Sequence, residues 1–531
     1  YYKSRIMHTI LPFLLAMVAV IVLLEMWATK LKIAYPILLV LAGLFIGFIP
    51  GLPKVRVDPD LIFLIFLPPL LFEASWSISL KEMKKWWRII GSFAFLVVFF
   101  TALSVALVAN NLIPGFTIAL GFLLGGIVAP PDAVSTAAIT KFVKIPRSTS
   151  TILEGESLLN DASSLIIFRF ALIAVGTGQF IWQQAAMSFI WMVIGGVAIG
   201  LFMAWIFIQS HKRFSFNASS DIALTIIEPY FMYWLAEQLH CSGVLAVVSG
   251  GLFMSTKRLV FLNSTSRIQA FNVWESFVFI LNGIVFMIIG LELPEIVEGL
   301  HAKGIPLSTA IGYGVLVTAV VIGARIVSSY AAMIATFIFR PSVAPRSESR
   351  FRILMPLVLG WSGMRGVVSL AAALAIPITL NNGTDFPQRN LTLFITFTVI
   401  LLTLVVQGLT LPWFIKRFDF FDVLMLEESS ESSKEKIRQG LKDHSFQFLN
   451  KKRLNATSDP GMENVLKIWE EKWKVTDDSA MNEKMKSAFI ELLDSQRQYL
   501  AELNKDPKID EEIIRQQLYQ LDLQEERLRI S

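Results

Sequence analysis

Apolar runs long enough to cross a lipid bilayer recur along the first 415 residues of this 531-residue chain. A transmembrane helix needs roughly 20 consecutive apolar residues. Hydrophobic residues make up 54% of the sequence and charged residues 17%, whereas a soluble domain carries about a quarter charged residues. The sequence therefore predicts an all-α, polytopic membrane protein.

The apolar runs predict thirteen transmembrane helices followed by a helical tail. Residues 425–531 carry apolar side chains at helical spacing on charged segments, which is typical of amphipathic helices outside the bilayer. We therefore divide the chain into a transmembrane domain, 1–424, and a C-terminal region, 425–531, for which the sequence indicates no particular partner. The predicted spans are about 7–28, 33–50, 60–79, 89–112, 116–140, 150–175, 181–209, 220–239, 242–256, 270–292, 306–339, 352–378 and 391–415.

The lysines and arginines of the connecting loops lie mostly on one predicted side of the membrane. Loops rich in these residues stay in the cytoplasm, so we expect the N-terminus outside and the tail in the cytoplasm, in the cell (plasma) membrane. The net charge of +5 reflects this orientation, and no nucleic-acid motif accompanies it. The sparsely charged side holds Lys3, Arg5, Lys54, Arg56, Lys303 and Arg389.

The predicted sixth span holds acids in a segment that otherwise suits lipid. Residues 153–170 read LEGESLLNDASSLIIFRF. Ionisable groups inside a membrane are costly and usually mark an ion or proton path. Residues four apart share a helix face, so Ser157 and Asp161 line one face and Glu156 and Asn160 line another. A hydroxyl and a carboxylate are oxygen ligands of the kind that hard cations prefer.

Glu156 needs a partner, because an unpaired buried carboxylate would take up a proton instead. The candidate is Arg325, which lies deep in the predicted eleventh span. We therefore predict a structural ion pair between Glu156 and Arg325. No second buried cation is left for Asp161, which becomes the candidate ion and proton carrier.

Two predicted spans contain breaks. The fifth reads GFLLGGIVAPPDAVSTAAI, and its double proline removes backbone donors, which membranes tolerate only in protein or beside a wet cavity. Asp132 follows this break as a cation ligand, a compensator of the half-helix dipole, or both. Glycines in the twelfth span, LVLGWSGMRGVVSLAAALAIP, flank Arg365, which we expect to balance helix carbonyl ends or nearby acids. Such paired interruptions are typical of inverted-repeat transporters with a site at the midplane.

Further charged residues lie in other predicted spans. Glu73 follows a double proline in the third span, LIFLIFLPPLLFEASWSI, and is a candidate ligand or gate carboxylate. Arg169 lies near the outer end of the sixth span, where we expect it to extend toward the membrane surface. We expect pairing at helix interfaces for Glu25, Glu228, Glu237 and Glu275, and the role of Glu228 before Pro229 stays open.

Four segments together resemble the monovalent cation/proton antiporters, in particular the sodium/proton exchangers of the NhaP and NHE type: FLPPLLFEAS, APPDAVSTAA, GESLLNDA and GMRGVVSLAAALAIP. The resemblance covers all the predicted spans in order and stops before the tail. It implies a NhaA/NhaP-like fold with inverted repeats and crossed, interrupted helices, assembled as a homodimer. A core of spans 4–6 and 11–13 would move against a dimerisation domain of spans 1–3 and 8–10.

The same resemblance implies a cation site. The family's ion-binding aspartate falls on Asp161 and its broken-helix aspartate on Asp132. Its serine falls on Ser157, its third-span acid on Glu73, and a main-chain carbonyl ligand on Pro131.

The resemblance also assigns a structural ion pair to Glu156 and Arg325, supported by Asn160. An asparagine before the carrier aspartate, as in Asn160–Asp161, accompanies electroneutral exchange in this family. The sequence departs from the family at APPD, where exchangers often have serine or threonine before the aspartate.

We therefore predict secondary active sodium/proton antiport by alternating access, in which a proton and a cation compete for Asp161. A potassium or other monovalent cation is the alternative, and a proton-coupled carrier of an organic solute or a cation channel is less favoured. We expect no enzyme activity, because no nucleophile–base pair or metal-ligand cluster is evident. No cofactor is expected beyond the transported sodium and proton, and the expected partners are the lipid bilayer and a second copy of the chain.

Overall fold

The computed structural model is built from helices. Among the described residues, the only extended pairing is an isolated bridge between Thr379 and Asp385. The predicted all-α class is therefore confirmed. The structure describes residues 2–49, 63–140, 147–178, 182–214, 217–339, 349–380, 383–417, 429–455, 483–506 and 509–530.

Eight helical stretches of the described chain are long and apolar enough to cross a membrane. Several run well beyond the 20 residues that a bilayer requires. They lie in α1 (Tyr2–Leu31), α5–η1–α6 (Leu80–Gly91, Ser92–Val97 and Val98–Leu112), α9 (Arg147–Thr177), α10 (Trp182–Phe214), α12 (Gly243–Phe261), α13 (Ser264–Ala302), α14 (Leu307–Phe339) and α17–η2–α18 (Arg389–Leu402, Thr403–Gln407 and Gly408–Arg417).

The other predicted spans fall on helices that are short, interrupted or more polar, so the number thirteen stays a prediction. Prolines open the short α4, and α11 is less apolar because it carries Asp221, Glu228 and Glu237. These helices are α2 (Tyr35–Gly47), α4 (Leu67–Ser77), α7 and α8 (Ile118–Val128 and Ala133–Thr140), α11 (Ala218–Gln238), and α15 and α16 (Ser349–Trp361 and Val367–Leu374).

The two predicted helix breaks meet each other. One separates α7 from α8 and the other separates α15 from α16. The backbone N–H of Asp132 donates to the carbonyl of Met364 at 2.7 Å, and Thr136 Oγ1 donates to the carbonyl of Ser362 at 3.0 Å. The backbone groups that a break frees are thus satisfied by the other broken helix, as buried backbone requires.

Small residues bring α7 close to α6. A Cβ atom on Gly121 would lie 2.7 Å from Cα of Ala106, and one on Gly125 would lie 2.8 Å from Cα of Ala102. Glycine and alanine allow such close helix packing inside membranes. Because α7 also packs along α9, these contacts fix the break after α7 against the helix that carries Asp161.

The chain divides into two compact units. The first comprises Tyr1–Ser210, Leu224–Lys257 and Trp274–Phe420, and the second comprises His211–Ala223, Arg258–Val273 and Phe421–Ser531. The proposed division of the membrane region into a core and a dimerisation domain stays a prediction.

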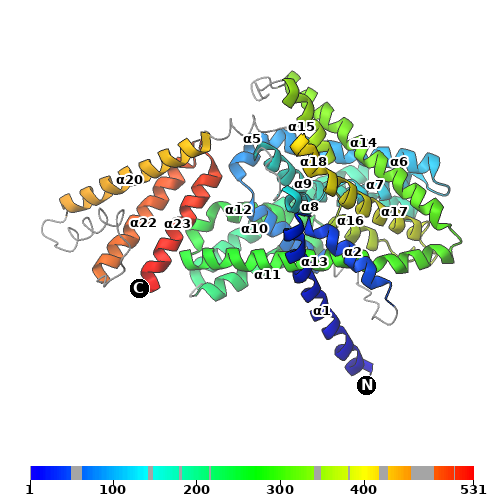
Figure 1. Cartoon of the computed structure of the whole chain (residues 1–531), viewed down its shortest axis with the longest axis horizontal. Helices are drawn as coiled ribbons and strands as arrows, with labels where there is room; N and C mark the ends of the chain where they lie inside the picture. The colour runs from blue at the N-terminus through cyan, green and yellow to red at the C-terminus, as the bar shows by residue number, and fades with distance from the viewer. Residues whose placement is uncertain are drawn as a thin grey trace. The chain divides into compact units, whose positions relative to one another are not determined.

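The tail contains three described helices that pack together (Figure 1, orange to red): α20 (Ser429–Asn455), α22 (Glu483–Leu503) and α23 (Glu511–Ile530). Their shared core includes Leu449, Leu492, Leu500, Ile513 and Ile514. The amphipathic spacing of the tail thus produces a small helical bundle.

This bundle is bonded to the start of α13. Arg267 Nε donates to Asp522 Oδ2 at 2.8 Å, and Ser264 Oγ donates to Glu525 Oε2 at 2.5 Å. Arg497 of α22 donates to Glu525 at 2.6 Å and to Ser264 Oγ at 2.9 Å. The second unit therefore joins the tail to the connection between α12 and α13.

Candidate cation site

Asp161 is buried on α9, with 7% of the residue exposed. Among the described residues, its carboxylate accepts no hydrogen bond and contacts no cation, and its charged neighbour is Asp132. A buried carboxylate in these surroundings is costly when it is ionised and uncompensated. Asp161 therefore needs a proton or a cation to be stable where it lies.

Asp132 caps the second half of the broken helix. One of its carboxylate oxygens accepts from the Val134 N–H at 3.2 Å, and the other accepts from Ser135 N–H at 3.2 Å and Ser135 Oγ at 2.5 Å. These donors stabilise negative charge at the N-terminus of α8. An ionised carboxylate offers about four lone-pair sites, so capping leaves room for a cation. This geometry suits both roles that the sequence left open for Asp132, compensation of the half-helix dipole and binding of a cation.

The carbonyl of Pro131 faces two side chains of α9. Ser157 Oγ lies 3.5 Å from this carbonyl oxygen, and Asn160 Nδ2 lies 3.4 Å from it. The structure thus brings Ser157 and Pro131 together next to the turn that carries Asp161. The amide of Asn160 lies on this side as well, and its support of the Glu156–Arg325 ion pair stays a prediction.

Glu156 and Arg325 form a two-pronged ion pair. Arg325 Nη1 and Nη2 donate to the two Glu156 oxygens at 2.6 and 2.9 Å. Both side chains are almost completely buried, with exposed fractions of 0% and 1%. This geometry is the strongest arrangement of an arginine and a carboxylate. The charge of Glu156 is therefore compensated, unlike that of Asp161.

Arg365 lies at the crossing of the broken helices. Its Nε donates to the carbonyl of Val128 at 2.9 Å and its Nη2 to that of Ala129 at 3.3 Å, while Nη1 contacts the carbonyl of Gly363. These oxygens include the carbonyl end of α7, where a cation offsets the negative helix dipole. Arg365 thus takes the position of a balancing charge.

Glu73 is not brought into this cluster. Its carboxylate accepts from Ser77 Oγ at 2.9 Å, one turn along α4, and its charged neighbours are Glu154 and Glu275. No contact with Asp161 or Asp132 is made among the described residues. The assignment of Glu73 as a ligand or gate stays a prediction.

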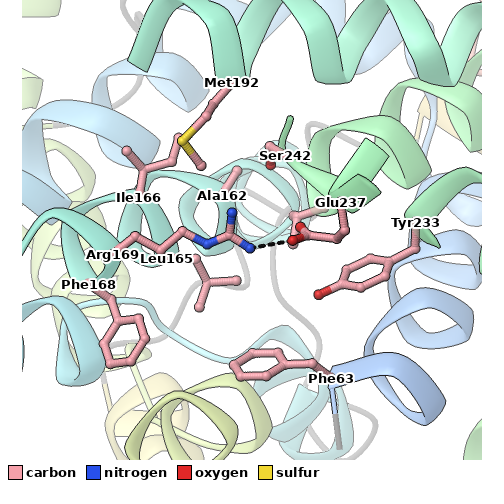
Figure 2. Close-up of a pocket in the computed structure, with 11 residues that line it drawn as sticks. Phe63, Ala162, Leu165, Ile166, Phe168, Arg169, Met192, Tyr233, Glu237 and Ser242 are labelled. Carbon is pink, nitrogen blue, oxygen red and sulfur yellow. Dashed lines mark hydrogen bonds and ion pairs between the residues drawn. The ribbon is translucent and has the colours of Figure 1, made fainter. Parts of the chain in front are cut away.

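Glu237, expected to pair at a helix interface, pairs with Arg169 farther along α9, a partner that was not predicted. Arg169 does not simply extend toward the membrane surface, because its Nη2 lies 2.5 Å from Glu237 Oε2 of α11 (Figure 2). The pair borders a cavity of about 60 Å³. The available signal was that both residues fall near the same predicted membrane face and carry opposite charge.

Comparison with known proteins identifies the family. A model of the transmembrane sodium/hydrogen exchanger family matches residues 15–417. An uncharacterised Na⁺/H⁺ exchanger of Mycobacterium bovis is 33% identical over 404 residues, which cover 75% of this chain and 73% of the relative. A sodium, potassium, lithium and rubidium/H⁺ antiporter of Bacillus pumilus is 29% identical, covering 76% of this chain and 61% of the relative.

The fold has a counterpart among solved structures. The sodium proton antiporter MjNhaP1 of Methanocaldococcus jannaschii superposes with a TM-score of 0.59 and 19% identity, covering 78% of this chain and 99% of that one. The resemblance drawn from the four sequence segments is therefore confirmed. The matched residues include all those around Asp161. The family consists of transporters and not of enzymes. The chain belongs to the sodium/hydrogen exchanger family.

Proposed function

We propose that this chain exchanges sodium ions for protons across a membrane and that Asp161 binds either one. The observation that supports this role is a buried carboxylate with no hydrogen-bond donor or cation among the described residues. A proton or a sodium ion neutralises such a group, but the two exclude each other. Competition for one carboxylate couples the two fluxes.

The groups around Asp161 suit a small hard cation, which prefers oxygen ligands. Ser157 supplies a hydroxyl, Pro131 a carbonyl, and Asp132 a carboxylate whose capping bonds leave acceptor capacity. Asn160 Oδ1 is a further buried oxygen, and it has no donor among the described residues. Sodium would supply the missing partner of Asn160 Oδ1 and of the Asp161 carboxylate.

Exchange follows from the cost of moving an uncompensated charge. An ionised Asp161 without its cation resists passage through a poorly hydrated barrier. The helices that carry it therefore change access only when a proton or a cation is bound, which prevents a leak of either ion. This is alternating access around a site in the crossed helices.

We further propose electroneutral exchange of one proton for one cation. Residue 160 is an uncharged asparagine, and Glu156 keeps its charge balanced by Arg325. Only Asp161 then changes its occupant during a cycle. An imposed membrane potential is expected to leave the exchange rate unchanged, and a severalfold change with voltage would contradict this stoichiometry.

The chain is proposed to act as a homodimer in the cell membrane, with its N-terminus outside and its tail in the cytoplasm. Large exposed apolar side chains along α10 support contact with lipid, because such a surface is unfavourable in water. They include Trp191, Ile194, Phe202 and Trp205.

Reconstituted vesicles test the exchange. Purified protein is placed in liposomes with an internal pH dye and a pH gradient, and sodium, potassium, lithium or choline chloride is added outside. Sodium is expected to change the internal pH fastest, whereas potassium or lithium would do so if either is the preferred cation. A pH response to none of the three would contradict antiport. A response to organic solutes alone would favour a solute carrier.

Two variants of α9 test the site. Asp161→Asn is expected to abolish exchange, because an amide cannot trade a proton for a cation. Glu154→Gln is the matched control: Glu154 is an exposed acid of the same helix, bonded to Ser150. Normal exchange by Asp161→Asn would refute the assignment even if the wild type is an antiporter.

A further inference from the structure

A cavity of about 60 Å³ runs along one face of α9. Ala162, Leu165, Ile166 and Arg169 line it, at spacings that place them on one side of a helix. Ala162 follows Asp161 directly, so the cavity reaches the helical turn that carries the proposed carrier group. Its volume accommodates a few water molecules. The cavity therefore lies between the site and the end of α9 that the sequence places outside.

The opposite wall belongs to α10, α11 and α12, which are closely packed together. Met192 and Glu237 line it together with Val244. The N–H of Ser242 donates to the carbonyl of Met192 at 3.1 Å, and a Cβ on Gly196 would lie 2.7 Å from the Ser242 carbonyl. These contacts leave little freedom between α10 and the start of α12, so this wall is one packed group.

The other faces of α9 pack elsewhere. Ser163 Oγ donates to the carbonyl of Ala94 in η1 at 2.5 Å, and a Cβ on Gly126 of α7 would lie 3.0 Å from the Phe168 nitrogen. α9 is thus packed closely with α7 and η1. The cavity follows the boundary between this group and α10–α12.

The ion pair of Arg169 and Glu237 crosses that boundary. Figure 2 shows Arg169 extending across the cavity to Glu237. Glu237 Oε1 also accepts from the N–H of Gly243 at 3.1 Å, which holds the carboxylate at the start of α12. Both charged side chains remain partly exposed, at 40% and 28%. The pair therefore sits at the rim of the cavity.

We propose that Arg169 and Glu237 close the entrance to the Asp161 site at this end of α9, and that they separate when the site opens to that side. The inference rests on the proposed role of Asp161 as the carrier. A partly exposed ion pair biases a two-state equilibrium by at most about fivefold. Such a bias favours closure without trapping the closed state, whereas a fully buried pair would be much harder to separate.

Reversible cross-linking tests whether the two groups must separate. Arg169→Cys and Glu237→Cys are combined with Cys241→Ala, which removes the only native cysteine. A short bis-methanethiosulfonate reagent then links the two thiols. Exchange is expected to fall at least tenfold and to recover when a reductant cleaves the link. The matched control is the same variant with a monofunctional methanethiosulfonate, which adds similar bulk but no link.

Thiol labelling tests the entrance without requiring transport. Leu165→Cys in the Cys241→Ala background places one thiol in the cavity, and a water-soluble methanethiosulfonate measures its access in detergent-solubilised protein. Adding Glu237→Gln is expected to raise the labelling rate up to about fivefold. Restoring opposite charges with Arg169→Glu and Glu237→Arg should return the rate toward its original value.

The outcomes separate the entrance from the proposed function. Undiminished exchange by the fully cross-linked protein, or labelling that ignores Glu237→Gln, would overturn the role of the pair while leaving antiport intact. Absence of exchange by the wild-type protein would instead refute antiport. The labelling rate of Leu165→Cys would still show whether Arg169 and Glu237 control access to the cavity.

Discussion

Glu156 and Asp161 lie on one helix, only five positions apart, yet their surroundings differ. Glu156 receives two charge-assisted hydrogen bonds from Arg325. Asp161 receives none among the described residues. The first acid is therefore held by a counter-charge as part of the scaffold, and the second is left to bind a mobile ion. The sequence spacing places Glu156 and Asp161 on different faces of α9, and the contacts of each face determine whether its acid is paired.

Removal of one partner of the buried ion pair should destabilise the protein strongly. Glu156→Gln leaves the Arg325 charge buried without its counter-ion, which costs about 3–5 kcal/mol. We expect a clear fall in the thermal unfolding temperature in detergent. Replacement of both residues by methionine should be milder than either single replacement, because no uncompensated charge remains. Equal losses in the single and double variants would contradict this account.

At the scale of elements, the crossing of the broken helices depends on close approach. Gly366 precedes α16, and a Cβ atom there would lie 2.8 Å from Cγ of Asp132. The capping carboxylate of α8 and the start of α16 thus occupy adjacent positions. Any side chain at this position must displace Asp132 or separate the two broken helices.

Gly366→Ala should therefore impair both folding and exchange. Overpacking of a tight site costs about 1–3 kcal/mol, and displacement of Asp132 disturbs the cation site. Gly312→Ala on α14 is the control, because a Cβ there meets no atom within 4 Å. Alanine at this helical position should stabilise by about 0.5–1 kcal/mol. Unfolding temperature and initial exchange rate measure both effects, and similar behaviour of the two variants would refute the steric explanation.

At the scale of the whole molecule, the second unit joins the tail to the ends of membrane helices. Arg497 connects α22 to Glu525 and Asp522 of α23 and to Ser264 of α13. Burial lowers the pKa of Arg497, but the carboxylates of Glu525 and Asp522 outweigh this and raise it above its usual value. The ion pairs of Arg497 lose their stabilising effect only when the pH rises through this raised pKa. Arg497 therefore remains charged from neutral to moderately alkaline pH.

Arg497→Gln should loosen the tail bundle. Amide hydrogen exchange in α23 and at the start of α13 is expected to become on the order of tenfold faster, because buried Glu525 loses the charge of Arg497 and Asp522 keeps only Arg267. Lys505→Gln is the control: the pair of Lys505 with Glu502 is exposed and contributes little. Sodium/proton exchange should persist, since the Asp161 site lies in the first unit. Unchanged protection in Arg497→Gln would contradict the role of this network.

The two helix breaks and the partner of Glu156 could be predicted from the sequence. The double proline at 130–131 cannot continue a helix, and α7 ends at Val128, just before it. The glycines around Arg365 likewise mark the gap before α16. Burial cost selected Arg325 as the partner of Glu156 because few buried cations are available in the spans. Each of these inferences depends on neighbouring residues or on a strong energetic demand.

Contacts that depend on how helices rotate against each other were not predictable in this way. Spacing placed Asn160 on the face of Glu156, yet its amide donates to Pro131. Helical periodicity fixes angles about one axis only and does not set the rotation against a neighbour. Arg169 presented the same difficulty, because it was expected to extend toward the membrane surface and instead pairs with Glu237. Long helices could be counted, but short and interrupted ones left the number of spans a prediction.

The crossing of the broken helices also has a consequence for biosynthesis. Arg365 donates to the carbonyl of Val128 across 237 residues of sequence. At about 5–20 residues per second, the ribosome needs on the order of 10–50 s to make that stretch. During this interval the end of α7 lacks its final partner, so water or assisting proteins must cover it. Completion of the first half of the transporter therefore waits for synthesis of the second.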